Sequence, residues 1–475
     1  MSTTTLTIWA GRVTINTFPD EVLLHIFYFD RPPFLDTLNV VNRPRPSWRW
    51  HRLAQVCQKW RSVIFGSPVF LDLRLVCSPR TRVEFTGIWP PLPIIIRNIV
   101  NWPMPEDYDF NAVIAHHNRV CEINLFHLSS SQLQRLTSSM QEQFPELIHL
   151  MLDFDDCSSH PAPALPDDFL GQSAPRLQSF ELRSIPFRAL PKLLLSSTDL
   201  VRLTLWNIPH SGYISPESMA TCLSSLIALE RLSLGFRSPQ SCPGRDRRCP
   251  PLPSRSVLHA LASLKFKGAS NYLEDLVARI DAPLLDTILI TFFNQLIFDI
   301  PHFSQFMRRT PRFEVLNGAH VVFDDYGVRV ESFPPSRTFD KRSGLRISCR
   351  VLDWQLSSLA QVCTSSFPSI RMVEYLYIYG PRNLPSQWQD DIENKQWLEI
   401  FHPFTGVKHL YVCKEFAQCI TLSLQELVRE GKTEVLPALE NLLLEELQPS
   451  GPVQEAIEQF IAARQRVTVS LWERN

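Results

Sequence analysis

A six-residue pattern, apolar-x-x-apolar-x-apolar, recurs through most of the chain and constrains its fold more than any other feature. Successive copies begin 23 to 34 residues apart, with one gap between residues 290 and 373. Chance is the alternative explanation because Leu is common, but near-constant spacing favours a true repeat. The copies are Val120/Ile123/Leu125, Leu147/Leu150/Leu152, Leu177/Phe180/Leu182, Leu200/Leu203/Leu205, Leu229/Leu232/Leu234, Leu261/Leu264/Phe266, Leu285/Ile288/Ile290, Val373/Leu376/Ile378, Val407/Leu410/Val412 and Leu439/Leu442/Leu444.

Each copy predicts a short strand, because its last two apolar residues lie two apart and point to the same face. Helical stretches are expected between strands; the clearest is 272–280, with Asn271 and Glu274 as its N-terminal cap. The period is that of leucine-rich repeats, in which one unit cannot bury its own apolar face and stacked units share a core. The asparagine of more regular repeats is missing. We therefore expect an irregular solenoid, closed by a last strand at Val467–Leu471.

The gap in the repeat contains two degenerate candidates for further strands. They are Phe313/Leu316 and Leu345/Ile347. The exact number of repeats is therefore left open.

Near the N-terminus, residues 18–27 (FPDEVLLHIF) predict an amphipathic helix. Pro19 suits the first helical position, where its missing N–H would have no partner in any case. Asp20 and Glu21 place negative charge in the first turn, which favours the helix dipole. Apolar side chains then recur at helical spacing, and Pro32-Pro33 is expected to stop the helix.

Residues 54–61 (AQVCQKWR) form a second motif. Leu53, Val56, Cys57 and Trp60 fall at i, i+3, i+4 and i+7, which predicts another amphipathic helix. The apolar stripes of these two predicted helices could simply pack on the rest of the chain. The order of the two motifs along the sequence favours a defined helical module instead.

Together these two motifs resemble an F-box, the small helical module that docks the Skp-type adaptor of cullin–RING ubiquitin ligases. The first hundred residues are similar to F-box proteins with leucine-rich repeats of the type expanded in mushroom-forming fungi, although residues 31–50 form a longer insert than in many F-boxes. The resemblance implies contact with the adaptor, or support of the helices that make it, by Phe18, Pro19, Val22, Leu23, Ile26, Phe27, Val56, Cys57 and Trp60.

The fold class expected is an α+β or α/β repeat. A small helical F-box-like module would occupy residues 15–75, a proline-rich connector 76–119 and an irregular leucine-rich-repeat solenoid 120–475.

The x positions of the repeat strands are expected to face away from the core and offer a binding surface. The middle repeats offer basic groups, which suit an acidic or phosphorylated partner, and the C-terminal repeats offer tyrosines, which are favoured at binding hot spots. The alternative is that these side chains are merely solvated. The residues are Arg183, Arg202, Trp206, Arg231, Lys265, Lys267, Tyr375, Tyr377, Tyr379, His409 and Tyr411.

Composition narrows the function classes. Net charge is −1 and charged residues make up 20%, so no global field indicates nucleic acid or an anionic membrane as partner. Neither a G-x-G-x-x-G nor a P-loop pattern occurs among 15 glycines. The 11 Cys are scattered, indicating reduced thiols in cytoplasm or nucleus, and the spacing of Cys242, Cys249 and His259 matches no zinc site.

No catalytic constellation or cofactor motif is recognisable in the sequence. The resemblance to F-box proteins implies that the chain is a non-catalytic substrate receptor. It would bind a Skp-type adaptor directly, a cullin indirectly and an unknown target protein through the repeats. A repeat scaffold that assembles no ligase is the alternative.

Overall fold

The computed structural model describes residues 15–29, 50–79, 91–155, 161–239, 255–295, 298–310, 317–333, 343–348, 352–366, 368–381, 394–431, 433–446 and 451–472. The chain divides into two compact units, Met1–Asp155 and Asp156–Asn475, each described by itself below.

The first unit begins with an N-terminal helical module made of α1 (Asp20–Phe29), α2 (Trp50–Ala54) and α3 (Gln58–Gly66), preceded by a 3-10 turn at Ile15–Thr17. Helix α1 begins directly after Pro19, whose carbonyl accepts hydrogen bonds from the N–H groups of Val22 and Leu23, both 3.1 Å long. The first predicted helix is therefore confirmed. The predicted stop at Pro32-Pro33 lies outside the described residues.

The prediction of one continuous helix from Leu53 to Trp60 is wrong. Helix α2 ends at Ala54 and α3 begins at Gln58, so the stripe from Leu53 to Trp60 is interrupted. Cys57 has extended backbone angles (φ −159°, ψ 171°), and its Sγ accepts a hydrogen bond from the N–H of Trp60 at 3.4 Å. Cys57 thus caps α3 instead of continuing α2.

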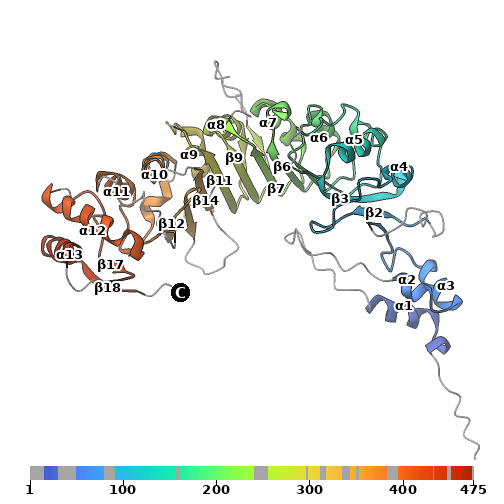
Figure 1. Cartoon of the computed structure of the whole chain (residues 1–475), viewed down its shortest axis with the longest axis horizontal. Helices are drawn as coiled ribbons and strands as arrows, with labels where there is room; N and C mark the ends of the chain where they lie inside the picture. The colour runs from blue at the N-terminus through green and yellow to red at the C-terminus, as the bar shows by residue number, and fades with distance from the viewer. Residues whose placement is uncertain are drawn as a thin grey trace, which may run out of the picture. The chain divides into compact units, whose positions relative to one another are not determined.

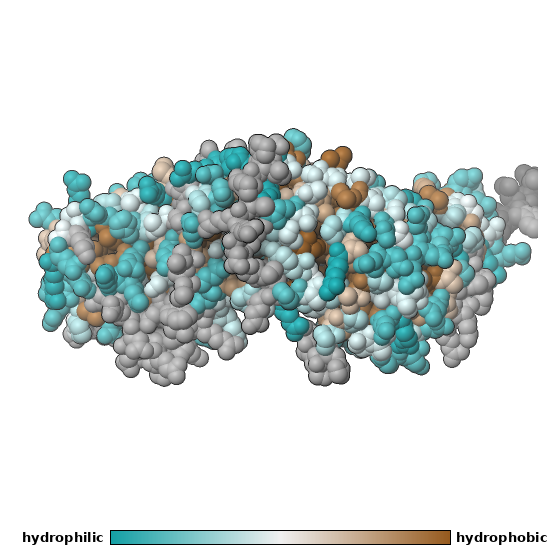
Figure 2. All heavy atoms as spheres, turned by 90° about the horizontal axis from the view of Figure 1, so that it is seen from above, coloured by the Kyte–Doolittle hydropathy of each residue, from teal (hydrophilic) through white to brown (hydrophobic). Residues whose placement is uncertain are grey.

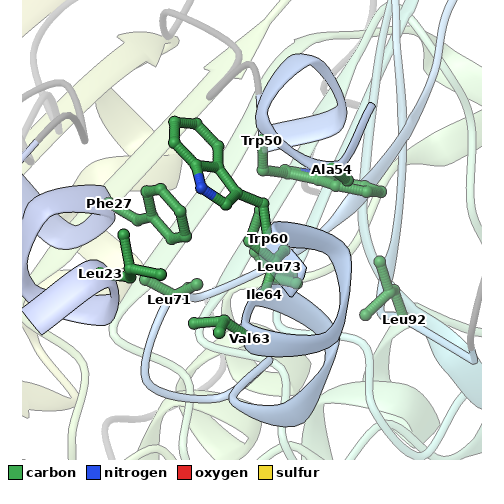
Figure 3. Packing of buried hydrophobic residues seen from close by; sticks show 10 residues of the cluster. All are labelled: Leu23, Phe27, Trp50, Ala54, Trp60, Val63, Ile64, Leu71, Leu73 and Leu92. Carbon is green, nitrogen blue, oxygen red and sulfur yellow. The ribbon is translucent and has the colours of Figure 1, made fainter. Parts of the chain in front are cut away.

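The three helices enclose one apolar cluster (Figure 3). The rings of Phe27 and Trp60 are in tilted contact, with centroids 4.9 Å apart and planes at 59°. The indole Nε1 of Trp50 donates to the carbonyl of Arg74 at 3.1 Å, which ties α2 to the segment after α3. The cluster consists of Leu23, Phe27, Trp50, Ala54, Trp60, Val63, Ile64, Leu71, Leu73 and Leu92.

Four strands of the first unit pair in parallel in chain order: β1 (Leu75–Cys77), β2 (Ile94–Arg97), β3 (Val120–Leu128) and β4 (His149–Phe154). Helices α4 (Phe110–Ile114) and α5 (Ser130–Ser139) and a 3-10 turn at His117–Arg119 lie between them in the chain. The sheet therefore begins before residue 120: β1 starts at Leu75, the last residue of the predicted module, and the sheet continues through the predicted connector. Strand β2 was not predicted, because the apolar run Ile94–Ile96 lacks the six-residue pattern.

In the second unit, strands alternate with helices along most of the chain (Figure 1). The strands of its main sheet are β5 (Ser179–Arg183), β6 (Arg202–Ile208), β7 (Arg231–Phe236), β9 (Ser263–Gly268), β11 (Thr287–Phe293), β12 (Gly318–Asp324), β13 (Gly327–Phe333), β14 (Ser343–Ser348), β15 (Tyr375–Tyr379), β16 (His409–Val412), β17 (Asn441–Leu444) and β18 (Thr468–Leu471). The helices are α6 (Leu190–Ser196), α7 (Pro216–Ser225), α8 (Ser270–Val277), α9 (Pro301–Arg308), α10 (Leu352–Ser366), α11 (Asn394–Phe401), α12 (Lys414–Arg429) and α13 (Pro452–Ala463). Shorter elements are 3-10 turns at Phe169–Gln172, His210–Gly212 and Pro368–Met372 and a small pair of strands, β8 (Ser256–Val257) and β10 (Ile280–Asp281).

The apolar positions of the repeat pair with one another across the parallel strands. Leu203 lies opposite Leu232, which in turn lies opposite Leu264, and all three are buried. Residues between them face the other side of the sheet and stay partly exposed. Figure 1 shows α7 and α8 along one side of β7 and β9. The predicted leucine-rich-repeat-like solenoid is confirmed, with β18 as its last strand beside β17.

The gap in the sequence repeat corresponds to an antiparallel insertion in the parallel sheet. The strand order here is β11-β14-β13-β12-β15. Strand β13 runs antiparallel to both β12 and β14, while β14 is parallel to β11 and β12 is parallel to β15. The candidate pair Leu345/Ile347 lies on β14 and is buried. Phe313 and Leu316 lie outside the described residues.

The predicted cap of the helix near residue 272 is wrong. Helix α8 begins at Ser270 after Ala269, which makes no side-chain cap. The buried carboxylate of Glu274 instead accepts hydrogen bonds from the N–H groups of His302 (2.8 Å) and Phe303 (2.7 Å) at the start of α9. Glu274 thus caps the helix of the following repeat.

Candidate protein-binding surfaces

Helix α1 divides its apolar side chains between the core of the module and its surface. Leu23 and Phe27 are 0% and 1% exposed. Val22 and Ile26 of the same helix are 40% and 39% exposed, and Phe18, two residues before the helix, is 38% exposed. A helix that shows this many apolar atoms on its outer face is typical of a binding surface. We call Phe18, Val22 and Ile26 the module face.

The remaining residues predicted to serve adaptor binding divide in the same way. Trp60 is in the module core, and Cys57 is half-buried as the cap of α3. Pro19 is exposed, and Val56 is exposed in the turn between α2 and α3. The ammonium of Lys59 donates to the carbonyl of Phe18 at 2.8 Å and lies 3.5 Å from a carboxylate oxygen of Asp20, which ties α3 to the start of α1.

Further exposed apolar residues of the module were missed in the sequence. Phe29 follows Ile26 by three residues and Val22 by seven, so helical spacing could have identified it. Phe70 contacts Tyr28 with ring centroids 5.2 Å apart, and its neighbour Val69 is among the most exposed apolar residues. Val69 and Phe70 follow α3 in a turn, where no periodic pattern marks them.

In the second unit, all predicted target-binding residues lie on one side of the main sheet, at positions that alternate with buried ones. We call this side the open face. Lys265 is exposed and the others are half-buried. Figure 2 shows the molecule turned by 90° from Figure 1, with hydrophobic residues in separate groups among hydrophilic ones.

Four cations of the open face lie on three neighbouring strands, and we call them the basic row. Arg202 on β6 lies directly opposite Arg231 on β7. Lys265 and Lys267 on β9 lie opposite Ser233 and Gly235 of β7. The ammonium of Lys267 lies 6.0 Å from the ring centroid of Phe293, and burial lowers the pKa of this lysine.

The other two residues predicted in the middle repeats have local partners. The Nε of Arg183 donates to a carboxylate oxygen of Glu181 at 2.6 Å, so the charge of Arg183 is partly compensated within β5. The indole of Trp206 lies against Gly235, where an added Cβ would be 2.6 Å from the ring. Glycine therefore makes room for the indole on the open face.

The tyrosines of the C-terminal repeats form a stacked aromatic group. The rings of Tyr377 and Tyr411 are nearly parallel with centroids 4.2 Å apart, and those of Tyr375 and His409 are 4.6 Å apart. Tyr379 lies 6.3 Å from Tyr377. Burial, reinforced by the neighbouring Tyr411, raises the pKa of Tyr377 above its ordinary value, so the phenol stays neutral.

Two members of this aromatic group were missed in the sequence. His320 on β12 contacts Tyr377 edge-on at 5.0 Å, and Trp472 meets Tyr411 edge-on at 5.5 Å. Trp472 follows Ser470 by two residues on the alternation of β18, which could have placed it on the open face. His320 lies in the insertion, where the repeat pattern gives no register.

Within the part of the chain that the structure describes, no group of three or more His, Cys, Asp or Glu side chains could hold a metal ion. None of the described helices is long and apolar enough to cross a membrane.

Comparisons with known proteins add little to this description. No model of a known protein family matches the chain, and no curated protein matches it. Among solved structures, the chain is similar to the leucine-rich repeat-containing protein LegL7 from Legionella pneumophila, with 12% identity, a TM-score of 0.29, and coverage of 82% of this chain and 98% of that one. The fold is therefore assigned from the strands and helices of this chain alone.

Proposed function

We propose that this protein is a non-catalytic receptor. In this proposal the N-terminal helical module is an F-box that docks a Skp-type adaptor, and the open face of the repeats holds a target protein. The chain itself does no bond chemistry. It raises the rate of ubiquitin transfer by keeping a target lysine near a charged ubiquitin carrier on a cullin–RING ligase.

The observation that carries the proposal is the division of apolar residues on α1 and directly before it into buried and exposed ones. Leu23 and Phe27 already have partners in the core, whereas the module face remains exposed. Burying a fully exposed Val, Ile or Phe side chain is worth about 1.5–3 kcal/mol, and a partner that covered the 38–40% of Phe18, Val22 and Ile26 that is still exposed would gain a fraction of that value at each of them. The motif order in the sequence is what favours a Skp-type adaptor as that partner.

The test is co-purification of the full-length chain with a Skp-type adaptor and a cullin. Retention of both supports the ligase receptor. Retention of the adaptor without the cullin favours the repeat scaffold. Failure to retain the adaptor overturns the assignment of the module.

A further inference from the structure

We propose that strands β6, β7 and β9 bind an acidic peptide segment of about five residues, whose carboxylates pair with the basic row. The inference rests on the proposed function in one respect: the segment belongs to the target held by the repeats. The basic side chains of the middle repeats suit either an acidic or a phosphorylated partner, and this inference selects the acidic one.

The first argument is charge. The outward positions of β6, β7, β9 and β11 hold four cations and, among these described positions, no carboxylate. The chain as a whole has a net charge of −1, so the basic row is a local feature. Arg202 and Arg231 are directly opposite each other on adjacent strands, which places two of the four cations side by side.

The second argument is length. Adjacent strands lie about 4.8 Å apart and residues two apart on a strand about 6.6 Å, so two strands and four residues separate Arg202 from Lys267 by about 16 Å. One phosphate group cannot span this distance, whereas about five residues of extended peptide can. Alternate side chains of such a peptide recur at about 6.6 Å, which is also the spacing of Lys265 and Lys267.

The third argument is desolvation at one end of the row. Lys267 is half-buried against Phe293, and its lowered pKa reflects the loss of water around the ammonium. A partner carboxylate would compensate for that lost hydration, and charge-assisted hydrogen bonds are stronger where water is partly excluded.

The test is fluorescence anisotropy with two labelled pentapeptides, Asp-Glu-Asp-Glu-Asp and its neutral counterpart Asn-Gln-Asn-Gln-Asn, titrated with the full-length chain. We expect only the acidic peptide to bind, and more weakly at higher salt. The double variant Arg231→Gln/Lys265→Gln should bind about tenfold more weakly. The control Lys192→Gln/Arg308→Gln removes the same charge from exposed positions on α6 and α9 and should bind normally.

Equal binding of both peptides, or an equal loss in the control variant, overturns the inference. Displacement of the peptide by inorganic phosphate or single-stranded DNA at lower concentrations than by unlabelled acidic peptide would also overturn it, in favour of a phosphate ligand. The same preparations are tested for adaptor retention. If the chain retains the adaptor but does not bind the acidic peptide, this inference alone is refuted. If it binds the acidic peptide but does not retain the adaptor, adaptor docking alone is refuted.

Discussion

Leu23 and Ile26 lie one helical turn apart on α1 but serve different purposes. Leu23 is enclosed by the module core, so its substitution tests folding. Ile26 lies on the module face, so its substitution tests binding. From the sequence alone, both residues looked equally suited to an adaptor interface.

We predict that Leu23→Asp destabilises the module by about 3–5 kcal/mol, because it places an unpaired charge in an apolar core. Ile26→Asp should change the free energy of unfolding by under about 1 kcal/mol. Limited proteolysis with mass spectrometry of the fragments would compare cleavage within residues 15–79. Equal protection of both variants would contradict the assignment of Leu23 to the core.

Glu274 shows how one carboxylate links two repeats. It is 7% exposed and accepts two backbone N–H groups from the start of α9. Burial is the main cause that raises its pKa to about 7; Asp299 and Asp275 add to the effect, and the two N–H donors oppose it.

The folded state therefore binds the Glu274 proton more tightly than the unfolded chain, in which Glu titrates near 4.3. Stability contributed by this proton is present below that value and should be lost as the pH rises towards 7, by up to about 3 kcal/mol. Glu274→Gln cannot titrate and should lack this part of the pH dependence. Urea unfolding of both proteins between pH 4.5 and 7.5 measures the difference, and parallel curves would refute the assignment.

At the scale of elements, the repeat strands could be predicted because each places its apolar side chains on one buried face. The insertion could not, because β12 and β13 form a hairpin with no six-residue pattern. Among the described strands of the insertion, β14 carried a candidate pair, Leu345 and Ile347, since these residues face the same core as the repeat residues. The caps made by Cys57 and Glu274 were also missed, because each depends on local backbone angles or on a partner in the next repeat.

Gly327 provides a test of the insertion. It lies in register with Asp324 across the hairpin turn, with φ +158°, and an added Cβ would be 2.0 Å from the carbonyl oxygen of Ile347 on β14. Gly327→Ala should force β13 and β14 apart and destabilise the second unit by at least about 1–3 kcal/mol. Urea unfolding measures this loss.

Gly344→Ala is the matched control for that experiment. Its added Cβ would make one tight contact, 3.0 Å from the end of the Leu289 side chain, which can move aside, and ordinary contacts at 3.7 Å and 3.8 Å with Glu331 and Val330. We expect a smaller loss of stability than for Gly327→Ala. The opposite order would contradict the pairing of β13 with β14.

At the scale of the whole molecule, the sequence identified residues of both candidate surfaces but not their full extent. Alternation along repeat strands placed the basic row and the tyrosines on the open face. His320 and Trp472 were missed because they come from the insertion and from beyond the last strand. The module face could be separated from the module core only once the packing of Phe27 on Trp60 was known.

The two surfaces differ in chemistry. The module face is apolar, so its binding should depend weakly on salt, whereas the basic row should bind less tightly as salt increases. This contrast would allow binding at the two proposed surfaces to be distinguished in one preparation.

The most direct measurement of the central claim is calorimetric titration of a purified Skp-type adaptor into three full-length proteins: wild type, Ile26→Asp and Leu195→Asp. Leu195 is an exposed apolar residue of α6 and serves as the control. The proposed receptor predicts binding by wild type and Leu195→Asp and at least about tenfold weaker binding by Ile26→Asp. Equal affinity for all three proteins, or no binding by the wild type, would contradict it.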